Sequence, residues 1–269
     1  MKNALHPSPQ PGGAVALGEL IRLWQSQPYV NGPGADALPE LLQTHRAVTE
    51  VLDLGPYLCW VLDVRTGGYC FMSSHAEGWL GASPRRFTEG GLAYTNGLLH
   101  PDDARGAWQL MQAIWQFLLD RPAGQRAAYA FSCDYRIRRA DGTYLRLLEQ
   151  NRVLQTDRHG NVTHLLGTGT DITHWKESAT LVASVTSAAD GTCLVCTSDD
   201  QVLKPQARIS KREKEVVQLI ASGYSSKQIA DRLYLSLHTV NTHRRNIIGK
   251  THYRNPGDLI RFAVRNGII

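Results

Sequence analysis

Apolar and polar positions follow the clearest pattern near the end of the chain, where helix start and stop signals alternate at short intervals. Ser210-x-x-Glu213 and Ser225-x-x-Gln228 are capping boxes, in which a serine and an acid or amide three residues later satisfy free backbone N–H groups at a helix start. Gly223 stands where the first of these helices should end. The pattern predicts two short helices.

Two more helices are predicted after them. Ser236 can cap a third helix that runs to about Lys250, and Asn255-Pro256 places a cap and a first-turn proline before a fourth. Only Tyr234–Leu235 separates the second helix from the third. Residues 208–269 are therefore predicted to form an all-α unit of four helices that contains a helix-turn-helix.

The third helix has two distinct faces. At about 100° per residue, its apolar side chains define a core face, made of Leu237, Val240, Ile247 and Ile248. The opposite face carries His238, Asn241, Thr242 and Arg245. Asn can bond adenine with two hydrogen bonds, Arg can bond guanine, and the Thr methyl can contact a thymine methyl. An ordinary surface helix is also polar outside, so this pattern alone leaves both interpretations open.

The middle of the chain, residues 57–176, has short strand-like segments around a helical centre. Five strands are predicted, separated by turn signals such as Asp141-Gly142: Leu58–Val64, Tyr69–Ser73, Tyr129–Arg139, Tyr144–Gln155 and Val162–Ile172. A long helix is predicted over Pro101–Asp120. Two strands, then helices, then three strands favour an α+β fold: a five-stranded antiparallel sheet with helices on one face.

The flanking segments give weaker signals. Residues 1–56 are predicted to be an extension in which 1–16 is disordered, Leu17–Trp24 forms a short helix, and Leu38–Leu54 forms an amphipathic helix after the breaker cluster at Asn31–Gly34. Residues 177–207 are rich in Ser, Thr and Ala and are predicted to be a linker with room for one hairpin.

Charge is divided unevenly along the chain. The net charge is +5, but residues 208–269 hold twelve Lys and Arg against four Asp and Glu, whereas residues 1–207 hold seventeen against twenty. A compact basic end on a mildly acidic body is the distribution expected for a polyanionic partner, and a solvated basic tail is the alternative that charge alone leaves open.

Other classes of protein are disfavoured by what the sequence lacks. No apolar run approaches the ~18 residues of a membrane span, and the first residues have no apolar signal segment, so we expect a cytoplasmic protein with no membrane contact. The five cysteines are scattered, and Cys193-x-x-Cys196 has no second pair of ligands at a suitable spacing. We therefore expect neither a disulfide framework nor a metal site.

Residues Ile209–Ile269 resemble the DNA-binding domain of LuxR/GerE-type regulators, through the continuous run SKREKEVVQLIASGYSSKQIADRLYLSLHTVNTHRRNIIGKT. The resemblance implies that the third helix enters the major groove and that the fourth often serves as a dimer contact. It assigns base contacts to Asn241, Thr242 and Arg245. It assigns DNA backbone contacts to four further residues: Lys227, Thr239, His243 and Lys250.

Two positions depart from that family pattern. Many members carry Lys where this chain has Asn241, so a preferred DNA sequence cannot be carried over. Arg244 stands where an apolar residue is common, on the core side of the third helix. We predict that its stem packs inward and that its guanidinium pairs with Glu213 or Glu215.

Residues 57–176 resemble a PAS domain. The resemblance rests on LLHPDD (98–103), YRIRRADGTYLRLLEQ (135–150) and DRHGNVTHLLGTGTDITHWK (157–176). Such domains sense small molecules, bind cofactors or mediate dimerisation, and the fold alone does not say which.

The sequence of the PAS-like segment does not identify a cofactor. The Asn-Cys-Arg motif of flavin photosensors is absent, and no haem motif is evident among the candidate ligands His75, His100, His159 and His164. His100 is expected to have a hydrogen-bonding role in its turn. Seven aromatic residues could line a pocket, although core packing is the default: Trp60, Tyr69, Phe71, Trp79, Trp108, Trp115 and Phe131.

Together these features predict a DNA-binding transcription regulator with no catalytic residues. The PAS segment would sense a signal or mediate dimerisation, and residues 177–207 would pass the change to the helix-turn-helix. The expected partners are double-stranded DNA and a second copy of the chain, with a small molecule in the PAS segment and RNA polymerase as further candidates. An enzyme is the main rival, but no nucleotide-binding glycine loop or phosphoacceptor histidine motif follows the PAS segment.

Overall fold

The computed structural model describes residues 11–30, 37–205, 210–251 and Leu259, and it divides into two units with the boundary after Pro205. The N-terminal unit has six α-helices within the described ranges: α1 Pro11–Gln25, α2 Ala37–Thr44, α3 Arg46–Asp53, α4 His75–Leu80, α5 Pro84–Leu98 and α6 Pro101–Leu119. A 3₁₀ turn, η1, covers Ala123–Ala128. The C-terminal unit has α7 Lys211–Ala221, α8 Ser226–Leu233 and α9 Leu237–Thr251.

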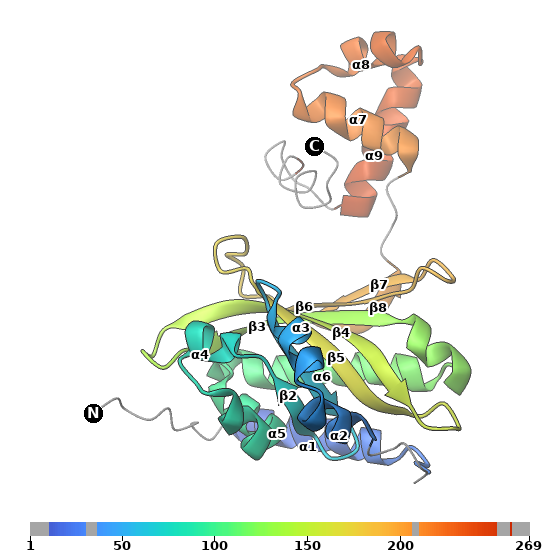
Figure 1. Cartoon of the computed structure of the whole chain (residues 1–269). Coiled ribbons are helices and arrows are strands. Elements are labelled where there is room, and N and C mark those ends of the chain that lie inside the picture. The colour runs from blue at the N-terminus through green and yellow to red at the C-terminus, as the bar shows by residue number, and fades with distance from the viewer. Residues whose placement is uncertain (1–10, 31–36, 206–209, 252–258, 260–269) are drawn as a thin grey trace. The chain divides into compact units, whose positions relative to one another are not determined.

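One antiparallel sheet forms the centre of the N-terminal unit (Figure 1). Its strands lie in the order β2-β1-β5-β4-β3-β6-β7-β8. They are β1 Leu58–Asp63, β2 Gly68–Met72, β3 Ala130–Arg138, β4 Tyr144–Thr156, β5 Val162–Asp171, β6 Val182–Thr186, β7 Cys193–Thr197 and β8 Asp200–Pro205. The five predicted strands are confirmed as β1 to β5, and the α+β class is confirmed with them. The sheet is larger than predicted, because it continues through three more strands.

The extra strands fall in residues 177–207, so the prediction of a linker there is corrected, while the hairpin that the sequence allowed is present as β6 and β7. β6 pairs with β3, from Ala130 opposite Thr186 to Cys133 opposite Ala183. Along β6, Ala183 and Val185 are buried while their neighbours are not. This is the period of two that a half-buried strand requires. The alternation was hard to see in the sequence, because the buried Ala183 and the neighbouring Ser184 are both small and differ little in hydropathy.

The core lies on the inner face of the sheet, against α1, α5 and α6. Along β3, the side chains of Phe131, Cys133, Tyr135 and Ile137 are buried one after another at every second position. Figure 1 shows α1 and α6 behind the sheet and α2 and α3 in front of it. The long helix α6 supplies eight buried apolar residues to this core and confirms the helix predicted over Pro101–Asp120.

The start of α1 corrects the prediction of disorder over residues 1–16, of which 1–10 lie outside the described residues. The helix begins at Pro11, where a proline loses no helical hydrogen bond. Gly13 lies so close to α5 and α6 that a Cβ atom there would be 2.6 Å from Asn96 Oδ1 and 2.8 Å from Ala104 Cβ. The glycines of this segment therefore allow close packing. The predicted helix over Leu17–Trp24 is confirmed within α1.

The single amphipathic helix predicted over Leu38–Leu54 is wrong in one respect: it is two helices, α2 and α3. His45 separates them with φ −107° and ψ 85°, outside the helical range. Leu42 of α2 is buried, whereas α3 has no buried residue. The two halves face different surroundings, which one straight helix could not reach. The breaker cluster at 31–34 lies outside the described residues.

A buried ion cluster joins the middle of the sheet to β6. The Asp134 carboxylate on β3 accepts hydrogen bonds from Arg146 Nε at 2.6 Å, Lys176 Nζ at 2.6 Å and the Val182 backbone N–H at 2.8 Å. The side chains of Asp134 and Arg146 are 3% and 6% exposed. Each charge is paired, so the cluster holds β3, β4 and the start of β6 in one register.

Asp134→Asn should destabilise the N-terminal unit by about 3–5 kcal/mol, because it leaves two cations without their buried counter-charge. All six tryptophans lie at or before residue 175, so tryptophan fluorescence during urea unfolding of the full chain reports on this unit alone. The matched control is Glu50→Gln, which breaks an ion pair with Arg46 whose side chains are 89% and 60% exposed. It should cost less than about 0.5 kcal/mol. Equal effects of the two changes would contradict the structural role of Asp134.

Candidate nucleic-acid interface

The C-terminal unit is a small bundle built on local capping. Both predicted capping boxes are present: Ser210 Oγ accepts from the Glu213 N–H at 3.2 Å, and Ser225 Oγ accepts from the Gln228 N–H at 3.4 Å. The bundle buries a narrow core, made of Val216, Val217, Ile229, Ala230, Val240, Ile247 and Leu259. The predicted fourth helix falls on residues outside the described part, apart from Leu259.

The turn between α8 and α9 is fixed by the backbone. Tyr234 has φ 53° and ψ 46°, in the left-handed region, and its N–H bonds the Asp231 carbonyl. The Leu235 N–H bonds the Ala230 carbonyl at 2.9 Å, which completes the usual helix-ending pattern of two crossed bonds. Gly223 ends α7 in the same way with φ 87°. The sharp turn directs α9 away from α8, as a helix-turn-helix requires.

Half of the core face predicted for α9 is wrong. Val240 and Ile247 are fully buried, but Leu237 is 49% exposed and Ile248 is 45% exposed. Leu237 and Ile248 lie farthest from the centre of the apolar stripe when the helix is phased at about 100° per residue. Two short neighbouring helices cover only the centre of that stripe, so its edges stay in contact with solvent.

The opposite face of α9 presents polar side chains to solvent. Asn241 and Arg245 are exposed, and Thr242 is half-buried with its hydroxyl donating to the His238 carbonyl at 3.0 Å. Ser236 caps the helix by accepting from the Thr239 N–H at 3.0 Å. The three residues predicted to contact bases therefore come together on one accessible face.

The four residues predicted to contact the DNA backbone differ in exposure and in hydrogen bonding. Lys227 is exposed near the start of α8, His243 is half-buried, and the Thr239 hydroxyl shares a 2.8 Å hydrogen bond with Ser236. Lys250 differs from them: its ammonium lies 2.9 and 2.7 Å from the two oxygens of the Glu213 carboxylate. Lys250 thus neutralises a buried acid inside the unit.

The Glu213–Lys250 pair joins the first turn of α7 to the last turn of α9. The Glu213 side chain is 4% exposed and that of Lys250 is 30% exposed. Burial alone raises the pKa of Glu213, but hydrogen bonds from Lys250 and Ser210 outweigh it and leave the pKa below its ordinary value. The acid is therefore ionised at neutral pH and holds the two helices together.

The pairing predicted for Arg244 is not found. Glu213 is bonded by Lys250, and Glu215 accepts from Arg212 Nη1 at 2.5 Å. Arg212 also donates to the Leu233 carbonyl, which ties α7 to the end of α8. Arg244 is half-buried. The prediction was wrong because both acids already have a cation that reaches them from a better-placed helix position.

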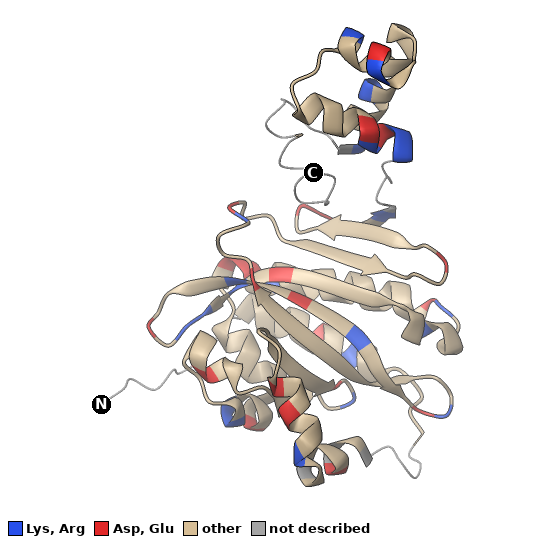
Figure 2. Cartoon of the chain, turned by 45° about the horizontal axis from the view of Figure 1, so that its top comes forward, with Lys and Arg blue, Asp and Glu red and all other residues tan. Residues whose placement is uncertain are grey.

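Basic residues lie on all three described helices of this unit (Figure 2).

Among the described residues, no group of three or more His, Cys, Asp or Glu could hold a metal ion. Cys193 and Cys196 are three residues apart on β7, so their side chains leave opposite faces of the strand. In the same described part, no helix is both long and apolar enough to cross a membrane.

A small cavity lies in the core of the N-terminal unit. Four of the seven predicted aromatic residues line it: Trp60, Tyr69, Trp108 and Phe131. Trp115 packs edge-on against Trp24 in the surrounding core, and Phe71 and Trp79 are partly exposed. His100 caps α6 by accepting from the Asp102 N–H at 3.2 Å, the hydrogen-bonding role that the sequence suggested.

Two family models match the chain in separate segments. Residues 69–169 match the model described as PAS fold, and residues 207–263 match the model described as bacterial regulatory proteins, luxR family. The chain therefore joins a PAS domain to a LuxR-family domain. Both resemblances seen in the sequence are confirmed, and the family match points to a DNA-binding regulator.

Curated relatives match the chain over a short stretch. Oxygen regulatory protein NreC of Staphylococcus carnosus (strain TM300) is 36% identical over 61 residues, which is 23% of this chain and 28% of that protein. The protein of the same name from Staphylococcus aureus (strain JH9) matches to the same extent. The chain thus spans little more than a quarter of the length of these relatives.

Solved structures resemble the chain more loosely. The N-terminal domain of a diguanylate cyclase with PAS/PAC sensor from Marinobacter aquaeolei covers 44% of this chain and 96% of its own, with 19% identity and a TM-score of 0.34. The phage VqmA–DPO complex covers 86% of this chain and 91% of its own, with 16% identity and a TM-score of 0.33.

Sequence reasoning missed the polar residues of the PAS cavity. Glu149 and Asn151 follow Leu145 and Leu147 at every second position of β4, so all four face the inner side of the sheet. An acid at an inward position of an alternating strand was the available signal.

Lys250→Met should destabilise the LuxR-family domain by about 2 kcal/mol, because it leaves the buried Glu213 carboxylate unpaired. Helix circular dichroism during urea unfolding should show the loss. Tryptophan fluorescence, which reports only on the N-terminal unit that contains the PAS domain (the PAS unit), should stay unchanged. Adding Glu213→Gln to Lys250→Met should recover most of the stability. Lys227→Met, which removes an exposed lysine, is the control and should leave stability unchanged.

The contribution of this pair should depend on pH. Because the folded-state pKa of Glu213 is lowered, its stabilisation is present above the ordinary carboxyl pKa and is lost as the pH falls through the folded-state value. The stability difference between the unchanged chain and Lys250→Met should therefore shrink in acid. A difference that stays constant into acid would contradict an ionised Glu213.

Proposed function

We propose that this chain is a transcription regulator in which the PAS domain controls DNA binding by the LuxR-family domain. The observation that carries the proposal is the accessible polar face of α9, opposite its buried Val240 and Ile247, in a unit that matches the luxR family model. A helix exposed in this way can enter the major groove, where each base pair presents a distinct pattern of donors and acceptors.

Asn241, Thr242 and Arg245 would contact the bases and so recognise the DNA sequence. Asn241 and Arg245 are four residues apart on one face, so both side chains can reach neighbouring bases along the groove. Arg245 can donate two hydrogen bonds to guanine, and Asn241 can bond adenine. The Thr242 hydroxyl is held by the His238 carbonyl, which leaves its methyl group for an apolar contact.

The DNA backbone would be contacted by Lys227, Thr239 and His243. Lys227 and Thr239 both lie near helix starts, where backbone N–H groups favour a phosphate. The phosphate contact first assigned to Lys250 is not part of the proposal, because its ammonium is bonded to Glu213.

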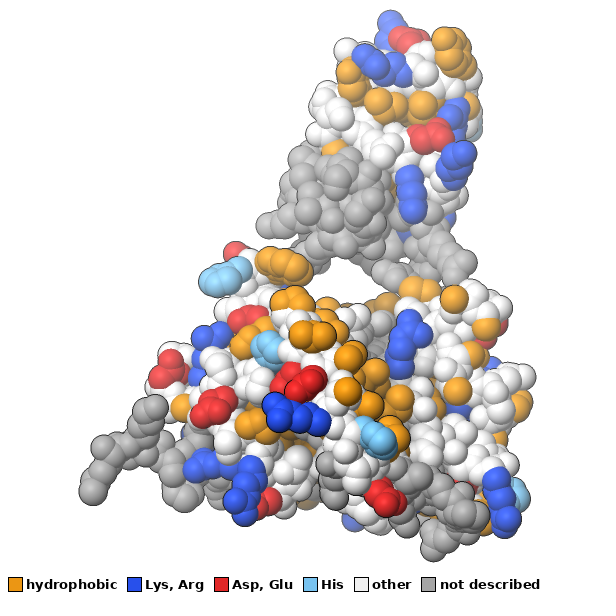
Figure 3. Space-filling model, in the orientation of Figure 1, with side chains coloured by type: hydrophobic (Ala, Val, Ile, Leu, Met, Phe, Trp, Pro, Cys, Tyr) orange, Lys and Arg blue, Asp and Glu red, His pale blue; other side chains and the backbone are white. Residues whose placement is uncertain are grey.

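A second copy of the chain is the proposed partner, since paired half-sites need two recognition helices. Figure 3 shows apolar side chains gathered in the middle of one face of the PAS unit. Val48, Val51 and Leu54, in and just after α3, are 36%, 64% and 80% exposed. RNA polymerase is the further partner that a regulator of this kind would engage. The proposed role is non-enzymatic and cytoplasmic.

Arg245→Ala should weaken binding to selected DNA by about 1–3 kcal/mol, roughly 5- to 150-fold, and relax the preference at one base pair. In-vitro selection of sequences bound by the full chain supplies the site, and fluorescence anisotropy at fixed salt measures the affinities. Selected sites that hold two half-sites one or more helical turns apart would report a dimer.

Lys227→Ala should instead weaken binding to all sequences evenly and reduce the slope of log affinity against log salt by about one. Lys214→Ala removes the same charge from an exposed position of α7 and serves as the matched control. Equal losses for Arg245→Ala, Lys227→Ala and Lys214→Ala on every sequence would refute the proposed assignment of α9.

A further inference from the structure

The PAS cavity has a chemical character that the family match does not specify. It measures about 40 Å³ and is enclosed by the inner face of the sheet, α1, α5 and α6. Seven aromatic residues contribute to its wall: Trp24, Trp60, Tyr69, Phe87, Trp108, Phe131 and Tyr135. A few polar groups share the lining, and among them are the carboxyl of Glu149 and the amide of Asn151.

The strand register aligns Asn151 with the aromatic wall. Phe131 lies opposite Asn151, which lies opposite Gly167, which lies opposite Trp60, so these four residues form one row across β3, β4, β5 and β1. A Cβ atom at Gly167 would be 2.1 Å from the Trp60 ring. The indole therefore lies on the bare backbone of β5 and forms a flat wall beside the Asn151 amide.

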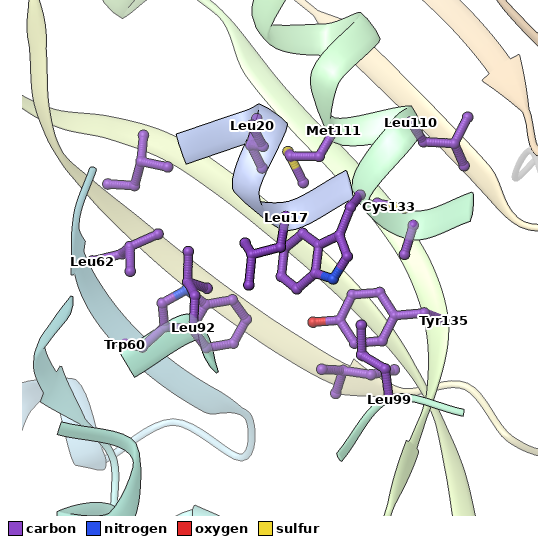
Figure 4. Packing of buried hydrophobic residues seen from close by; sticks show 14 of the residues in the cluster. Leu17, Leu20, Trp60, Leu62, Leu92, Leu99, Leu110, Met111, Cys133 and Tyr135 are labelled. Carbon is purple, nitrogen blue, oxygen red and sulfur yellow. The ribbon is translucent and has the colours of Figure 1, made fainter. Parts of the chain in front are cut away.

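Glu149 is held in the cavity by neutral donors. The Tyr135 hydroxyl donates to one carboxyl oxygen at 2.7 Å, and Asn151 Nδ2 donates to the other at 2.6 Å. Figure 4 shows the Tyr135 hydroxyl directed from β3 into the interior. Burial raises the pKa of Glu149, and these two hydrogen bonds reduce the rise. A carboxylate in such surroundings favours an added positive charge.

Asn151 also leaves an acceptor without a partner. The residue is 2% exposed, and within the described part of the chain its Oδ1 atom has no hydrogen-bond partner. Nδ2 is committed to Glu149, which fixes which amide atom remains. A buried acceptor left unpaired lowers stability, and a ligand that donates an N–H to it removes that penalty.

We propose that the PAS cavity binds a small organic amine in its protonated form, and this inference rests on the proposed role of the PAS domain as the sensor. The ammonium donates to Asn151 Oδ1 and lies beside the Glu149 carboxylate. The aromatic faces of Trp60, Trp108 and Phe131 surround the cation and its hydrocarbon part, as cation–π contacts require.

The cavity also limits the size of the amine. A volume of about 40 Å³ holds only a few water molecules, each of which needs ~10–15 Å³. A compound with about five non-hydrogen atoms suits this space, with Met72 and Met111 in the lining as adaptable side chains. Trp24 Nε1 lies in the same lining and has no hydrogen-bond partner among the described residues, so a neutral hydroxyl could accept from it instead.

A matched series of ligands tests the charge. Isobutylamine, isobutanol and isobutyrate have similar shapes and differ in charge, and each is titrated into the full chain at constant ionic strength. Thermal unfolding followed by tryptophan fluorescence reports binding to the PAS unit. We expect isobutylamine to raise Tm in a saturable way and to bind at least tenfold more tightly than isobutanol, with isobutyrate without effect.

Glu149→Gln tests the site. The substitution keeps the shape and removes the charge; Gln Oε1 can still accept from Asn151 Nδ2, and Gln Nε2 can donate to the Tyr135 hydroxyl oxygen. It should therefore weaken isobutylamine at least tenfold and leave isobutanol within twofold. If this variant does not fold, the ligand series on the unchanged chain still decides. Equal affinities for amine and alcohol, preference for isobutyrate, or no binding of any of the three would overturn the proposal.

The two proposals fail in different assays. Binding of the full chain to its selected DNA, measured without amine, depends on α9 and not on the ligand series. Intact DNA binding with no amine binding would reject the ligand class and keep the regulator. Amine binding with no DNA binding would do the opposite.

Discussion

The inner face of the eight-stranded sheet is the constraint on which the rest of the PAS unit depends. A sheet of this size must cover one side with apolar surface, and α1, α5 and α6 provide it. This demand explains the glycine at position 13 of α1, since a Cβ atom there would be too close to Asn96 of α5 and Ala104 of α6. A second constraint acts at the edge of β3, which would present unpaired backbone groups if β6 did not pair with it.

Two acids of this unit, Asp134 and Glu149, have different surroundings. Asp134 satisfies two cations and a backbone N–H, so its charge is fully used in holding strands together. Glu149 has two neutral donors and faces a void, so its charge is available. The two acids lie on neighbouring strands, β3 and β4, and differ in what surrounds them. That difference separates a structural ion cluster from a candidate ligand site.

The LuxR-family domain follows a different rule, because it is too small to rely on burial. Its apolar core is narrow, and both capping boxes, two left-handed helix ends and the Glu213–Lys250 pair supply the remaining order. The polar side of α9 therefore does not pack against the rest of the domain. Asn241 and Arg245 are therefore accessible to a partner, while Lys250, which looks equally available in the sequence, is occupied inside the domain.

The sequence by itself determined the features that depend on neighbours along the chain. Capping boxes, turn residues and strand alternation are local, so the helices α7 to α9, the strands β1 to β5 and the polar face of α9 could all be predicted. Tertiary structure decided what depends on distant partners: the pairing of Lys250 with Glu213 instead of Arg244, the exposure of Leu237 and Ile248, the pairing of β6 with β3, and the meeting of Glu149 with Asn151 and the aromatic wall. These arrangements required the register of strands and the packing of helices that are far apart in the chain, and no local pattern encodes them.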